Sequence, residues 1–107
     1  AVAFAGAPIL VRLDARGRPL WARRYETDVP AQPRELLRGA GGEVLLVGTL
    51  FDPRGGRSPF LLRIGADGAL GAAREYRGLE ANEVHAAAEA GEGRIVVAGR
   101  QQALGAQ

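Results

Sequence analysis

The 107-residue chain is nearly half apolar and about a quarter charged, which is typical of a globular protein rather than a disordered or fibrous one. It contains no cysteine, so a disulfide framework and a thiolate metal site are excluded, and no apolar stretch approaches the ~20 residues of a transmembrane helix. The net charge is only +2, and the cations, all arginines, are spread along the chain, which argues against nucleic-acid binding.

The first elements are short apolar segments separated by turns. Residues 8–13 and 20–25 have the lengths and bulky side chains of β-strands rather than helices. A strand is also expected at 1–6, because this segment resembles those at 43–48 and 94–99. Gly17 lies in the turn at 14–18 and supplies the positive φ that a tight hairpin requires.

A polar connection at 27–33, which contains two prolines, comes before a short strand predicted at 34–38. A glycine-rich turn at 39–42 leads into a strand at 43–49. Because this turn joins two strands instead of opening a helix, we interpret it as a hairpin and not as a phosphate site.

The same pattern then returns. Residues 8–48 overlay residues 59–99 without a gap, at an offset of 51. The overlay predicts strands at 59–64, 69–76, 84–90 and 94–99. Alanine would favour a helix at 84–90, but the repeat register predicts a strand there.

A repeat of about 50 residues built from short strands is typical of a propeller or solenoid unit. The expected fold is therefore all-β and, together with the family resemblance described next, it is a β-propeller fragment of about two four-stranded antiparallel blades. We divide it into a partial blade (1–25), a complete blade (33–76), a partial blade (83–99) and a tail (100–107).

The run Leu13-Asp14-Ala-Arg-Gly17-Arg-Pro-Leu-Trp21-Ala-Arg-Arg-Tyr25, a Gly-Gly turn and then Val-Leu-Leu-Val-Gly48 resemble bacterial β-propeller repeat proteins, the SBBP-type and quinoprotein-like blades. The resemblance implies that 34–38 and 84–90 line a central channel and that Trp21 and Tyr25 lie toward the rim. The second repeat departs from this pattern, because Ala72 stands at the position of Trp21 and Gly65 at the position of Asp14. The resemblance favours a periplasmic, cell-surface or secreted protein.

A blade is apolar on both faces because each face packs on a neighbour. If each outer face exposes on the order of 400 Å² of apolar surface, burial worth roughly 10 kcal/mol per face is unrealised. We therefore expect partners: further blades from the same longer chain, symmetry copies, or another protein. Three or four copies would give about six to eight blades.

His85 is the only histidine and Ser58 the only serine, so neither a catalytic triad nor a multi-histidine metal site is expected. Catalytic residues, metal and cofactor are all predicted to be absent. The loop at 50–59 is the main candidate for binding a partner or anion, through two arginines able to grip a carboxylate or phosphate. Its candidate residues are Asp52, Arg54 and Arg57.

The function expected from the sequence is a non-catalytic structural or protein-interaction module within a larger propeller. The alternative is a ligand- or substrate-binding propeller whose site forms in the channel of the completed ring. A convergent polar pocket near Arg34, Glu83 and His85 would favour that alternative.

Overall fold

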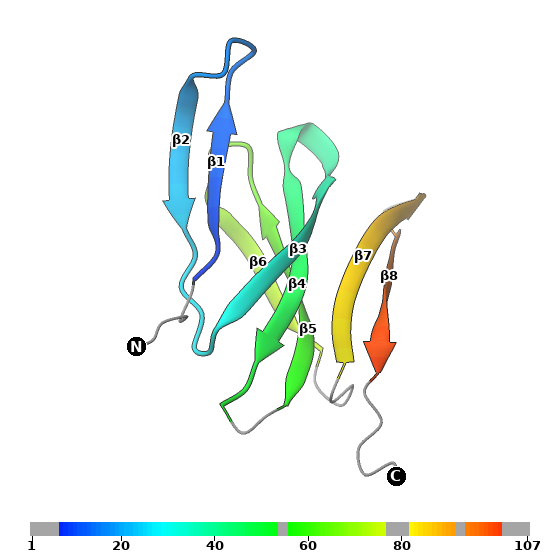
Figure 1. Ribbon diagram of the computed structural model, residues 1–107. Coiled ribbons are helices and arrows are strands. Elements are labelled where there is room, and N and C mark those ends of the chain that lie inside the picture. The colour runs from blue at the N-terminus through cyan, green and yellow to red at the C-terminus, as the bar shows by residue number, and fades with distance from the viewer. Residues whose placement is uncertain (1–6, 54–55, 77–81, 92–93, 102–107) are drawn as a thin grey trace, which may run out of the picture.

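The structure is a computed structural model that describes residues 7–53, 56–76, 82–91 and 94–101. The strand expected at 1–6, the loop residue Arg54 and the end of the expected tail (102–107) lie outside these residues. The described strands form a hairpin, a four-stranded sheet and a second hairpin (Figure 1). They are β1 (Ile9–Leu13) with β2 (Pro19–Arg24), then β3 (Ala31–Arg38), β4 (Val44–Phe51), β5 (Arg57–Ile64) and β6 (Leu70–Glu75), then β7 (Asn82–Gly91) with β8 (Arg94–Gln101).

All neighbouring strands pair in antiparallel fashion, so the prediction of an all-β antiparallel fold is confirmed. The strand predicted at 84–90 is also confirmed, since β7 pairs with β8 along this segment. Pairing with a valine-rich neighbour overrides the helical preference of its alanines.

The β1–β2 and β5–β6 turns have the same geometry at the same repeat position. Gly17 and Gly68 adopt φ values of +83° and +89°, and each donates a backbone hydrogen bond to the residue three positions earlier. In the first turn the Asp14 carboxylate accepts the backbone N–H groups of Arg18 and Arg16. These two bonds lower the pKa of Asp14.

Two predicted boundaries were wrong. Strand β3 begins at Ala31, inside the segment expected to be a polar connection. Its proline, Pro33, is tolerated because β3 is an edge strand and the register shifts just after this residue. The loop expected at 50–59 is shorter, since β4 continues to Phe51 and β5 begins at Arg57.

The four-stranded sheet lies between the two hairpins (Figure 1). One of its faces packs on β1–β2 through a core cluster of apolar side chains. Its other face packs on β7, where Val47, Thr49 and Val84 are almost completely buried. The cluster against the first hairpin contains Tyr25, Leu46, Phe60, Leu62 and Ile64, with Leu10 and Trp21 partly buried beside it.

Burial along the strands reflects this layering. In β4 every residue from Leu45 to Thr49 is buried, because both faces of the strand are covered. In β1 burial alternates, since only one face of the hairpin is covered. The uncovered face is apolar and consists of Ile9, Val11 and Leu13.

Candidate functional site

Two hydrogen bonds join the first hairpin to the turn between β5 and β6. The indole Nε1 of Trp21 donates to the carbonyl oxygen of Ala66 at 2.9 Å, and the phenol of Tyr25 donates to that of Gly68 at 2.7 Å. Burial raises the pKa of Tyr25. The glycine permits this approach, since a Cβ at position 68 would lie 3.1 Å from the Trp21 ring.

Tyr76 occupies the same repeat position as Tyr25, yet its surroundings differ. Tyr25 is 7% exposed and Tyr76 is 41% exposed. Tyr25 meets a sheet that includes β5 and β6. The sheet beyond Tyr76 has only β7 and β8 within the described residues, so it offers no counterpart of the β5–β6 turn.

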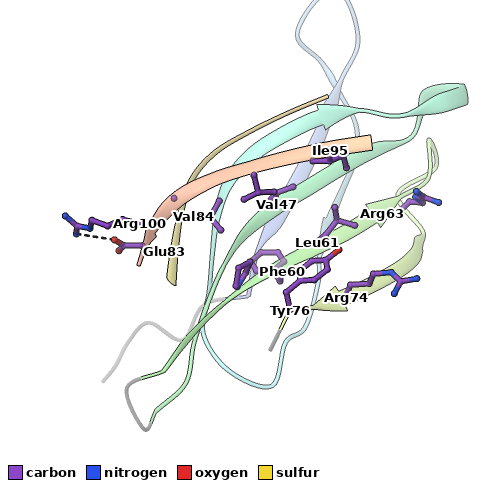
Figure 2. A pocket seen from close by; sticks show the side chains of 13 residues that line it. Val47, Phe60, Leu61, Arg63, Arg74, Tyr76, Glu83, Val84, Ile95 and Arg100 are labelled. Carbon is purple, nitrogen blue, oxygen red and sulfur yellow. Dashed lines mark ion pairs between the residues drawn. The ribbon is translucent and has the colours of Figure 1, made fainter. Parts of the chain in front are cut away.

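An open cleft of about 660 Å³ lies between β5–β6 and the β7–β8 hairpin (Figure 2). Arginines 63 and 74 lie at one side of the cleft, and the Glu83–Arg100 ion pair lies at the opposite end. The apolar lining comes from Val47, Leu61, Tyr76, Val84, Ile95 and Val97.

Glu83 is the centre of a charged cluster at that end. Its Oε2 lies 3.3 Å from an Arg57 guanidinium nitrogen. Its Oε1 lies 3.5 Å from Arg100 and 3.6 Å from His85 Nε2. The Arg57 guanidinium also lies over the ring of Phe51, 5.4 Å from its centroid. The cluster therefore ties the start of β5 to β7 and β8.

The residues predicted to bind a partner or anion lie in different surroundings. Arg57 is half-buried at the start of β5, where its guanidinium pairs with Glu83. Asp52 is exposed in the turn, where its backbone N–H donates to Gly56. The third residue of that prediction, Arg54, lies outside the described residues.

Of the predicted channel residues, Glu83 and His85 come together and Arg34 is exposed on β3, outside the charged cluster. Arg34 and His85 nevertheless share a structural position. Each falls at a register shift, between Pro33 and Glu35 in β3 and between Val84 and Ala86 in β7. Each is thus the extra residue of a β-bulge, a feature that re-aims side chains.

A glycine faces each bulge. A Cβ on Gly48 would collide with the backbone of Gln32 and Pro33, and a Cβ on Gly99 would collide with that of Glu83. In the repeat, each of these glycines directly follows a run of four apolar residues, at 44–47 and at 95–98. Their recurrence was visible in the sequence, but the close backbone approach behind it was not.

The described residues contain no group of three or more His, Asp or Glu side chains that could hold a metal ion. In the same part of the chain, no helix has the length and apolar character to cross a membrane.

No protein-family model, curated protein or solved structure matches this chain. The resemblance to propeller repeats therefore remains a prediction from the sequence.

Proposed function

We propose that this chain is a structural or protein-interaction module, without catalysis of its own, that forms part of a larger β-propeller. In such a ring each four-stranded sheet is a blade covered on both faces by its neighbours. The observation that carries this proposal is the difference between Tyr25, which is buried, and Tyr76, which is exposed at the equivalent position.

Tyr25 is buried because the next sheet presents β5 and its turn. The same tyrosine in the second copy faces an apolar cleft. Two more strands on the β7–β8 hairpin would give Tyr76 the environment that Tyr25 already has. The outer face of β1 supports the same proposal at the other end of the chain. Its side chains Ile9, Val11 and Leu13 are all apolar yet exposed, as expected for a face that a neighbouring sheet would cover.

A tandem fusion of two copies of the chain tests this proposal. The linked copies bury one new sheet-to-sheet interface, so the unfolding free energy should exceed twice that of the single chain, as in other repeat arrays.

The control uses one substitution at two places. Ile9→Asp in the second copy places a charge at the junction and should destabilise the fusion. The same substitution in the first copy lies on the exposed outer face and should have a smaller effect. Equal effects from both positions, or no gain in stability on fusion, would contradict the proposal.

The ligand-binding alternative is favoured by one observation, the paired bulges that carry Arg34 and His85. Both side chains suit an anionic ligand. Calorimetric titration of the tandem fusion with small dicarboxylates should then show binding that is lost in the Arg34→Ala, His85→Ala variant. Absence of binding in the parent fusion would contradict this alternative.

A further inference from the structure

We propose that the β1–β2 hairpin of a second copy of this chain completes the β7–β8 sheet by adding β1 to the edge of β8. This inference rests on the proposed function and names the occupant of the cleft. Within the described residues β8 pairs only with β7, and β1 pairs only with β2. Among the described residues, each strand thus has one edge without a pairing strand, which is a template for another strand.

The internal repeat supplies the register. Strand β4 pairs with β5, and β8 and β1 are the repeat counterparts of these strands at the offset of 51. Transferring the observed pairs Val44↔Ile64, Leu46↔Leu62 and Gly48↔Phe60 gives the intermolecular pairs Ile95↔Leu13, Val97↔Val11 and Gly99↔Ile9.

The same transfer explains the apolar outer face of the first hairpin. Ile9, Val11 and Leu13 are the counterparts of Phe60, Leu62 and Ile64. The latter three are at most 5% exposed, whereas the former are 48–67% exposed. On the edge of β8, the β1 side chains of the second copy would face β5–β6 and fill the cleft (Figure 2).

Tyr76 provides a polar match for this docking. Tyr25 donates to the carbonyl oxygen of Gly68, and Gly17 is the counterpart of Gly68 with the same left-handed backbone. In the transferred arrangement the Tyr76 phenol would donate to the Gly17 carbonyl oxygen of the second copy. The contact would thereby cover both the exposed Tyr76 phenol and the exposed apolar face of β1.

The contact is head-to-tail, because β8 of one copy meets β1 of the next. Such heterologous contacts produce a closed ring or an open filament. The described part of each copy contributes eight strands, enough for two four-stranded sheets, so a ring closed by this contact would have an even number of sheets.

Disulfide trapping tests the register directly, since the chain has no cysteine of its own. Directly opposed residues of antiparallel strands have Cα atoms about 4.5–5.5 Å apart, within the range that a disulfide spans. One chain carries Val97→Cys and a second, isotopically labelled chain carries Val11→Cys. Both side chains are exposed, so folding should be preserved, and far-ultraviolet circular dichroism checks this.

After mixing and oxidation, mass spectrometry should find a disulfide between labelled and unlabelled chains. The matched control pairs Val96→Cys with Val11→Cys. Position 96 is out of register and on the opposite face of β8, so the mixed disulfide should be lost.

Equal yields for both pairs, or no mixed disulfide at all, would overturn the inference. A further repeat would then be the occupant of these edges. A stabilised tandem fusion without trapping would leave the proposed function standing, whereas failure of both tests would remove both proposals.

Discussion

The phenol of Tyr25, the residue directly after β2, donates a 2.7 Å hydrogen bond to the backbone carbonyl oxygen of Gly68, in the turn between β5 and β6. This bond joins two sheets that share no strand-to-strand pairing. It shows how one sheet is fastened to the next by the hairpin turn of its neighbour. Tyr76 occupies the matching repeat position and is 41% exposed, and the sheet next to it has no β5–β6 turn within the described residues.

Tyr25→Phe should lower the free energy of unfolding by about 1–3 kcal/mol, because it leaves a buried carbonyl oxygen without its donor. Urea unfolding at several protein concentrations measures this loss. The bond lies within one chain, so the loss should be the same at every concentration.

Tyr76→Phe is the matched control. At the lowest concentration its effect should stay within about 0.5 kcal/mol, as expected for an exposed side chain. Its cost should grow with concentration as chains associate. A large, concentration-independent effect of Tyr76→Phe would contradict the distinction between the two tyrosines.

Stability should also fall at alkaline pH through Tyr25. Burial raises its pKa above the ordinary value of about 10, so the folded chain favours the protonated phenol. The resulting stabilisation is fully present below the unfolded-state pKa and is lost as pH rises through the folded-state pKa. Unfolding measured between about pH 9 and 11 should show a decline that is weaker in Tyr25→Phe. An identical decline in both chains would disprove this assignment.

Gly48→Ala should destabilise the central sheet by about 1–3 kcal/mol or more, since the added methyl group would collide with the backbone at the β3 bulge. Gly71→Ala is the control. There the nearest atom is the Arg63 carbonyl oxygen at an ordinary 3.5 Å, so the change should stay within about 0.5 kcal/mol. Similar losses in thermal or chemical unfolding would show that the bulge does not require glycine.

Glu83→Gln should cost about 1 kcal/mol or less at low salt, because it removes the carboxylate shared by Arg57, His85 and Arg100. The difference from the parent chain should shrink as salt is raised. Glu26→Gln removes a more exposed ion pair with Arg24 and should have no measurable effect. A salt-independent cost at Glu83 would show that packing, not charge, dominates the cluster.

The repeat in the sequence predicted where most strands lie, because pairs of matched segments constrain each other more than either does alone. Hairpin glycines such as Gly17 and Gly68 were predictable for the same reason, since a tight turn needs a positive φ. The strand at 84–90 followed from register against its own propensity.

The charged cluster was not predictable as a unit. Arg57 and Glu83 are 26 residues apart and do not occupy matching repeat positions, so no sequence pattern links them. The bulges at Arg34 and His85 were missed because a one-residue shift is decided by the backbone approach of Gly48 and Gly99. Alternating hydrophobicity alone does not reveal such a shift.

Sedimentation equilibrium of the 107-residue chain over a wide concentration range, with circular dichroism to verify folding, is the most direct test of whether the two outer faces must be covered. We predict association into complexes of several copies, with the exposed apolar residues of β1 withdrawn from water. A well-folded monomer at every concentration, unfolding cooperatively without a partner, would contradict this.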